Sequence, residues 1–156
     1  MNKVEVYKEL CSIFEKQWDR WKYDGSDSLA KVGTNRRGVY QGYPMTVTDY
    51  PCLGIMPESV NQELTGSYNA EDTSFIVQLY FYAFDFSLPK SAILILEMDS
   101  TINKIISENR NITGLVDRTV INSTSFGEFW RSGSSGGDVI AFGGMKTIEI
   151  SGYAER

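Results

Sequence analysis

The side chains that most often carry out catalysis are scarce in this chain. Its 156 residues include no histidine and only two cysteines, Cys11 and Cys52. The lack of histidine excludes a Ser-His-Asp triad, a Cys-His pair and every zinc site that needs a histidine ligand. Two distant cysteines cannot supply an all-cysteine zinc site or a disulfide framework. The sequence therefore predicts no metal ion and no cofactor. It predicts a buried free thiol at Cys11, which lies in a helical pattern, and a reducing compartment.

Loops that bind phosphate or cations are also missing. The glycine-rich stretch 133–144 has no Gly-Lys-Ser/Thr after it, and no G-x-G-x-x-G opens a helix. The acidic segment Asp24–Ser28 lacks the ligand spacing of a calcium loop, so we interpret it as a turn that ends a helix.

Four carboxylates offer the remaining route to chemistry. Glu58, Glu63, Glu71 and Asp72 lie along one predicted hairpin, and a pair of carboxylates can hydrolyse a glycosidic bond. Acidic residues on a polar hairpin are usually only solvated. We predict that the protein is not an enzyme, and we keep a histidine-free hydrolase as an alternative that a strongly raised carboxylate pKa in a cleft would favour.

Composition is typical of one globular domain. The chain is 42% hydrophobic, and fifteen Lys and Arg against twenty Asp and Glu give a net charge of −5. That charge argues against general nucleic-acid binding, which needs a concentrated basic face. The N-terminus has no apolar signal region, and the longest aliphatic run, Ala92–Leu96, is far too short to span a membrane.

The strongest structural signal is an apolar strand predicted over Ser74–Phe84, rich in β-branched and aromatic residues. Alternation assigns an apolar face to this strand, which we expect to lie against the core: Phe75, Val77, Leu79, Phe81 and Ala83. The other face is aromatic and partly polar: Ile76, Gln78, Tyr80, Tyr82 and Phe84. This second face fits a contact with another sheet or subunit, or else a central strand covered on both sides within one chain.

An amphipathic helix should follow this strand. Ser87 is a candidate N-cap, Pro89 fits the first turn, and Gly114 follows the expected end. Its apolar residues recur every three or four positions: Ala92, Ile95, Met98, Ile102, Ile105 and Ile106. With a strand over Leu115–Ser123, this gives a β-α-β core in which the helix covers the apolar face of the first strand.

The flanking elements complete an α+β fold. A helix is expected over Val4–Tyr23, and residues 65–72 should form a polar connection between two strands. Short strands are expected over Val39–Pro44, Tyr50–Pro57, Val60–Leu64, Phe126–Trp130 (with Gly127 as a candidate bulge), Val139–Phe142 and Met145–Tyr153. We predict a single domain, 1–156, with a mainly antiparallel sheet and projecting hairpins, packed against a long central helix and an N-terminal helix.

This order of elements resembles the tail terminator family of tailed bacteriophages, also called tail completion or minor tail proteins, to which head-tail joining proteins are related. The resemblance covers about Tyr7 to Tyr153. It depends on element order and on short patterns such as Val39–Gly42, Tyr50–Pro57 and Phe126–Phe129. Relative to the family, the chain has longer loops at about 24–38 and 130–138. The family has no catalytic residues to transfer.

The resemblance implies a structural virion protein. Family members form hexameric rings that cap the completed tail tube, stop its polymerisation and join it to the head-side connector or neck protein. Their rings are built by side-by-side packing of β-sheets, a head-to-tail contact that closes by rotation. Partners would be further copies of the chain, the tail tube protein and the connector, in a virion assembled in the host cytoplasm, with no membrane involved. DNA would pass through the lumen without specific binding, which suits an acidic chain.

On this basis we predict two contact regions. The subunit interface would include Gln78, Tyr80, Tyr82 and Phe84, because an exposed aromatic surface is an aggregation hazard unless a partner covers it. Loops that reach neighbouring rings would span Leu64–Thr73 and Trp130–Val139. The residues of these loops that we expect to make the contacts are Tyr68, Asn69, Glu71, Asp72, Trp130 and Arg131.

Two further alternatives stay open. Another ring-forming virion protein, such as a tail tube or neck subunit, would share this plan but stack into open tubes. A soluble binding module for a small ligand or host protein would use the aromatic face as its pocket and remain monomeric at high concentration.

Overall fold

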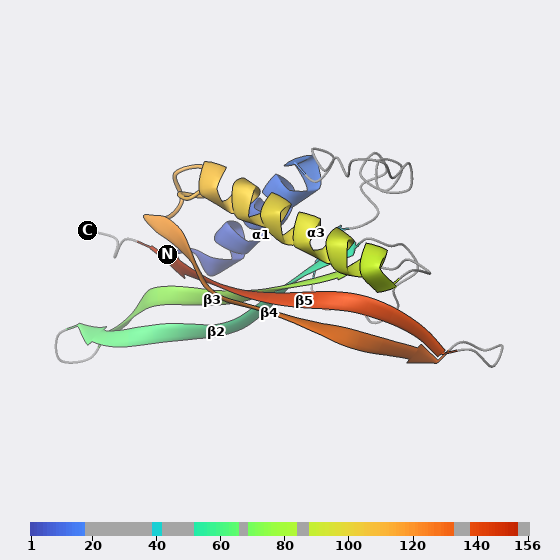
Figure 1. The fold of residues 1–156 in the computed structure, drawn as a ribbon. Helices are drawn as coiled ribbons and strands as arrows, with labels where there is room; N and C mark the ends of the chain where they lie inside the picture. The colour runs from blue at the N-terminus through green and yellow to red at the C-terminus, as the bar shows by residue number, and fades with distance from the viewer. Residues whose placement is uncertain (18–38, 42–51, 66–68, 84–87, 133–137, 153–156) are drawn as a thin grey trace.

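The computed structural model describes residues 1–17, 39–41, 52–65, 69–83, 88–132 and 138–152 of the chain. One five-stranded sheet carries two helices on the same face (Figure 1). The helices are α1 (Lys3–Gln17) and α3 (Leu88–Glu108), and the strands are β1 (Val39–Gln41), β2 (Cys52–Thr65), β3 (Asn69–Ala83), β4 (Arg118–Ser132) and β5 (Asp138–Ser151). The predicted α+β architecture is confirmed.

The sheet is built from two long hairpins. The strand order is β1-β2-β3-β5-β4, with every pairing antiparallel except that of β1 with β2. β3 and β5 pair only over residues 74–83 and 142–151, so each hairpin continues beyond this shared central part. The β2–β3 hairpin projects at one end of the sheet and the β4–β5 hairpin at the other (Figure 1).

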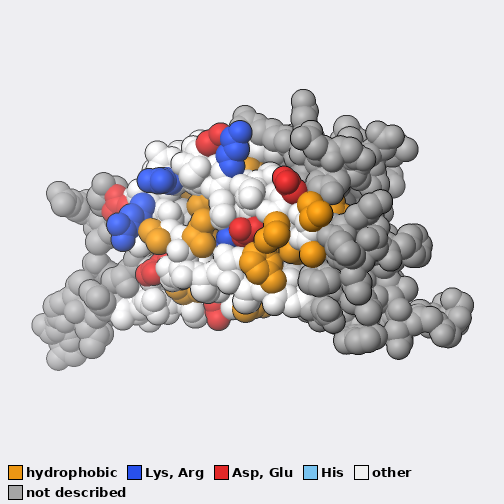
Figure 2. All heavy atoms as spheres, viewed as in Figure 1, with side chains coloured by type: hydrophobic (Ala, Val, Ile, Leu, Met, Phe, Trp, Pro, Cys, Tyr) orange, Lys and Arg blue, Asp and Glu red, His pale blue; other side chains and the backbone are white. Residues whose placement is uncertain are grey.

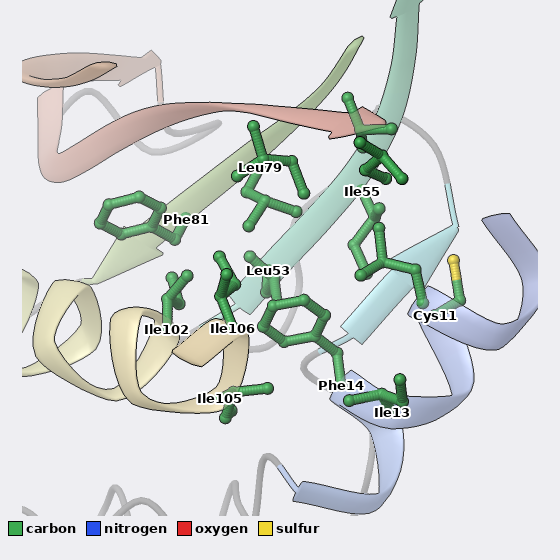
Figure 3. Packing of buried hydrophobic residues seen from close by; sticks show 14 of the residues in the cluster. Cys11, Ile13, Phe14, Leu53, Ile55, Leu79, Phe81, Ile102, Ile105 and Ile106 are labelled. Carbon is green, nitrogen blue, oxygen red and sulfur yellow. The ribbon is translucent and has the colours of Figure 1, made fainter. Parts of the chain in front are cut away.

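Alternation along β3 gives the predicted apolar face. Phe75, Val77, Leu79 and Phe81 are buried, together with Leu53 and Ile55 of β2 and Ile148 and Ile150 of β5. We call the side of the sheet that bears these residues the helix face. The apolar stripe of α3 packs on it, as predicted, and α1 contributes Val6, Leu10, Cys11, Ile13 and Phe14 (Figure 3). Burial of this single contiguous cluster is the main stabilising contribution to the fold.

Several predicted strand ends are wrong. β2 runs without interruption through Pro57, where we predicted an end, and an extra residue, Glu58, forms a bulge. Beyond Ile55 no described strand pairs with the outer edge of β2, and a proline without an amide hydrogen is tolerated at such an edge. The bulge predicted at Gly127 is also wrong, because Gly127 pairs in register with Gly143 and the β4 irregularity lies between Ile121 and Ser123.

The predicted contact loops are largely strand. Asn69, Glu71 and Asp72 belong to β3, and Trp130 and Arg131 belong to β4. The hairpin ladders continue to Thr65↔Asn69 and Ser132↔Asp138, which leaves only residues 66–68 and 133–137 as connections. Polar composition misled the prediction here, because polar and turn-forming residues gather in these stretches although most of them belong to strands.

Other predicted features fall outside the described residues. These are Tyr68, Phe84, the longer loop at 24–38 and the last part of the predicted N-terminal helix, of which residues up to Gln17 are described.

A turn with unusual backbone geometry joins α3 to β4. Ile112 and Thr113 have φ values of 44° and 59°, followed by Gly114 at 84°. A β-branched residue rarely adopts this left-handed region, yet Ile112 is fully buried in the core cluster. Hydrogen bonds from the Ile112 and Gly114 amides to the Asn109 and Asn111 carbonyls hold the turn. Packing of Ile112 therefore fixes where the chain leaves the helix and enters β4.

Phe81 occupies space that only a glycine leaves free. A Cβ atom on Gly144 would overlap the Phe81 ring, whose edge also meets Phe126 with centroids 6.4 Å apart. We expect Gly144→Ala to lower the free energy of unfolding by about 1–3 kcal/mol, the usual cost of overpacking a core. Urea unfolding followed by circular dichroism measures this change. Gly127→Ala is the matched control, because nothing lies within 4 Å of its added carbon; equal losses in both variants would contradict the account.

Candidate functional site

The second face of the sheet carries the predicted aromatic interface. Cross-strand register places Met56, Gln78 and Thr147 in one row, and Gly54, Tyr80 and Met145 in the next. We call this side the opposite face, since both described helices lie on the helix face (Figure 1). The Tyr80 hydroxyl donates a hydrogen bond to Gln78 Oε1 within this surface.

The predicted interface residues differ in accessibility. Gln78 and Tyr80 are half-buried and Met56 is exposed, so they can meet a partner. Tyr82 is only 5% exposed, and its side chain is therefore already buried within the single chain. Of the four residues predicted for this interface, the structure places Gln78 and Tyr80 at the surface and Tyr82 in the interior, while Phe84 lies outside the described residues.

A buried ion pair joins the helix face of the sheet to α3. Lys146 of β5 is 1% exposed, and its Nζ lies 2.6 Å from Asp99 Oδ1 of α3 and donates a 2.7 Å hydrogen bond to Thr124 Oγ1. Asp99 Oδ1 has no partner of hydrogen-bond geometry, so its contact with the ammonium group acts through charge. A buried lysine can serve as a catalytic base or form a Schiff base. Here it is fully enclosed and paired, which favours a structural role.

A cavity of about 330 Å³ lies between the C-terminal half of α3 and the start of β4. Asn103 Nδ2 donates a 3.3 Å hydrogen bond to Asp99 Oδ2, which connects the cavity to the ion pair. Two buried oxygens among the lining residues, Asn103 Oδ1 and Thr119 Oγ1, have no hydrogen-bond partner. The cavity is lined by Asn103, Ile106, Ser107, Arg110, Arg118, Thr119, Val120 and Ile121.

Sequence reasoning missed both the ion pair and this cavity. Alternation along the last strand puts Lys146 on the side of Ile148 and Ile150, but nothing in the spacing indicates that Asp99 meets it across the sheet–helix interface. The cavity depends on the left-handed turn around Ile112, and this backbone geometry has no reliable sequence signal before Gly114.

The described residues contain little else that could carry out chemistry. No group of His, Cys, Asp or Glu within them has the geometry of a metal site, and none of the described helices is long and apolar enough to cross a membrane. Both cysteines are free and buried. Burial is the main cause that raises the pKa of the Cys11 thiol to about 11, against a smaller opposing effect of its hydrogen bond with Tyr7. This thiol stays protonated at neutral pH and is a poor nucleophile.

Comparison with models of known protein families and with curated proteins found no match to this chain. The resemblance to tail terminators therefore stays a prediction from the sequence.

The Lys146–Asp99 pair gives a sharp stability test. Asp99→Asn leaves a buried ammonium group uncompensated, and we expect it to lower the free energy of unfolding by about 3 kcal/mol. The estimate is at the low end of the usual range because Asp99 is 20% exposed. Lys146→Met, which removes the charge and keeps most of the side-chain length, should cost much less.

The double variant Asp99→Asn with Lys146→Met separates charge from packing. We expect it to unfold at a higher urea concentration than Asp99→Asn alone, because no unpaired charge remains. If Asp99→Asn lowers the free energy of unfolding by less than Lys146→Met does, Asp99 does not compensate the charge of the buried lysine.

Proposed function

We propose that the protein is a structural subunit of a phage virion that forms a ring, ends the tail tube and joins it to the head-side connector. The observation that carries the proposal is the mismatch between the sheet and its helices. Two helices cover one face of the shared central part, while both hairpins project beyond it and the opposite face presents Tyr80, Gln78 and Met56. Such surfaces suit a protein whose neighbours complete its burial.

The long sheet edges support the same proposal. β4 is a fifteen-residue edge strand, and among the described strands only β5 pairs with it. Among the strands that the structure describes, the outer edge of β2 is paired only at Leu53–Ile55. Average strands are about five or six residues long, and edges of this length are templates for association unless another chain covers them. A head-to-tail contact between two different edges closes into a ring when the rotation permits.

The proposed subunit has no catalytic role and no cofactor. Its partners are further copies of itself in a hexameric ring, the tail tube protein and the connector or neck protein, with DNA passing through the lumen without specific contacts. The surrounding compartment is the host cytoplasm during assembly and the virion tail or neck afterwards. The runner-up is another ring-forming virion subunit, a tail tube or neck protein, which would stack into open tubes.

The deciding measurement is the number of copies bound to tail tubes of the same phage. We expect free rings of six by mass photometry, or six copies at one end of each tube. Tyr80→Ser should weaken this assembly by about tenfold, since aromatic residues at the centre of an interface dominate its energy. Val4→Ser is the control, because Val4 is exposed on α1, away from the opposite face.

Tyr82→Ser is unsuited to this test, since loss of its buried side chain would destabilise the fold itself. If the Tyr80→Ser variant assembles as well as the wild type, the assignment of Tyr80 to a subunit interface is wrong. A wild-type protein that stays monomeric and does not bind tubes would refute the proposed function and favour a soluble binding module.

A further inference from the structure

α3 and β4 run side by side along one edge of the sheet. Lys146 links them near their middle, since its ammonium group contacts Asp99 of α3 and Thr124 of β4. The two elements run in opposite directions (Figure 1), so the end of α3 lies beside the start of β4, where the cavity is. We call the surface between the two elements, from the cavity past the ion pair to the N-terminal half of α3, the α3–β4 surface.

The end of this surface away from the cavity is apolar. Leu96 lies one helical turn before Asp99, and Phe126 lies two residues after Thr124 on the same face of β4. Leu96 is 55% exposed, Phe126 is 48% exposed, and Ile93, a further turn along α3, is 47% exposed. Only two other large apolar side chains of the described residues are exposed. A group of exposed apolar side chains, unlike a single one, marks a binding surface.

The cavity end of this surface is basic. Arg110 and Arg118 are the only charged residues that line the cavity, and both are exposed. Neither forms an ion pair with any residue in the described part of the chain. Figure 2 shows the two characters separated, with Lys and Arg side chains gathered near the end of α3 and hydrophobic ones further along between α3 and β4. A partner that matches both ends is apolar at one end and carries a carboxylate at the other.

The backbone of β4 selects the shape of such a partner. β4 is the last strand of the described sheet, so its outer edge offers backbone amides and carbonyls that no described strand pairs with. From Phe126 back to Arg118 the strand covers about 26 Å, at about 3.3 Å per residue. From Leu96 to Arg110 the helix covers about 21 Å, at about 1.5 Å per residue. One extended segment of about nine residues can therefore reach both ends.

The chain itself does not provide this segment. The other long open edge among the described strands belongs to β2, and Pro57, the bulge at Glu58 and a second irregularity after Asn61 interrupt it. A second β4 across residues 118–126 would bring no carboxylate to the arginines, because this stretch contains neither Asp nor Glu. Residues 127–132 of β4 and the opposite face stay available for contacts between copies.

We propose that β4 accepts an extended segment of a different protein as an additional strand along the α3–β4 surface. The segment places apolar side chains from alternate positions against Leu96 and Phe126, and a carboxylate about eight residues away beside Arg110 and Arg118. Main-chain hydrogen bonds to the β4 edge supply affinity, and the side chains supply specificity. This inference goes beyond the proposed ring function and does not depend on it.

Selection of displayed random peptides on the immobilised full chain identifies what this surface accepts. Peptides of about twelve residues are long enough to span it. We expect the enriched sequences to share apolar residues at alternate positions, with Asp or Glu about eight residues away. A selection that enriches no common pattern, or one with the three-and-four spacing of an amphipathic helix, would overturn the proposal.

Substitutions at each end locate the bound peptide. Fluorescence anisotropy of a labelled enriched peptide measures its Kd for the full chain. Leu96→Ser with Phe126→Ser, and Arg110→Gln with Arg118→Gln, should each raise this Kd by about tenfold or more, because each removes one end of the match. Added salt should weaken binding to the wild type more than binding to the arginine variant, since screening acts on the charged end.

Matched controls change the same residue types elsewhere. Val4→Ser with Met56→Ser removes two exposed apolar side chains from other surfaces, and Lys8→Gln with Lys16→Gln removes two exposed cations from α1. Both controls should keep the wild-type Kd. Circular dichroism and urea unfolding check that every variant folds. Leu96→Ser alone replaces the apolar pair if loss of the Phe126 contact with Phe81 destabilises the chain.

N-methylation of the peptide tests for strand pairing. Alternate amides of an extended peptide point to opposite edges, and an added strand pairs along only one of its own edges. Methylating one alternate set of amides should therefore abolish binding, whereas methylating the other set should leave the Kd within about threefold. Equal effects of the two sets would overturn the proposed mode of binding.

The remaining outcomes separate the possible occupants. A wild-type Kd in both substituted variants would show that the peptide binds elsewhere, and the proposal would be wrong. If the chain self-associates, the enriched peptide disperses it and the same variants lose self-association, a second copy occupies the surface and a different protein does not. The proposed ring is tested separately by Tyr80→Ser on tail tubes, so either proposal can fail without the other.

Discussion

The apolar helix face shared by β2, β3 and β5 is the constraint on which the rest of the structure depends. Both helices pack on it, and Leu53, Leu79 and Ile148 at its centre are fully buried. The area that two helices can cover is limited by their length, about 1.5 Å per residue, whereas a strand rises about 3.3 Å per residue. Strands of fourteen or fifteen residues therefore extend well beyond a helix of similar residue count. The projecting hairpins follow directly from this difference.

The same constraint explains which parts of the fold could be predicted from the sequence. Burial on the helix face imposes alternation on β3 and a stripe on α3, so spacing alone is enough to assign Phe75, Phe81 and Ile102 to the core. Where the hairpins extend beyond the shared central part of the sheet, packing against the helices no longer imposes this alternation. Asn69 and Arg131 consequently lie in stretches with the composition of loops although they belong to strands. The predictions at Pro57 and Gly127 are wrong for a related reason, because the effect of these residues depends on which edge of the strand is paired.

The candidate site is less accessible to prediction than the fold. Alternation assigns the aromatic residues of β3 to one face, but it cannot show that Tyr82 is enclosed while Tyr80 reaches the surface. The cavity needs three features at once: the flank of α3, the turn at Ile112 and the edge of β4. Each is defined by tertiary packing, and the cavity residues from Asn103 to Ile121 have no shared period that would mark them in the sequence.

The ion pair of Lys146 and Asp99 connects the core to this cavity. A buried lysine adds less stability than an apolar side chain of similar size would, so the pair does not strengthen the fold by itself. It does fix the position of Asp99, which accepts a hydrogen bond from Asn103. That bond orients the Asn103 amide and directs its oxygen away from the carboxylate, where it has no partner. The orientation of this polar group in the cavity thus depends on the buried charge of Lys146, which holds Asp99 from the core side.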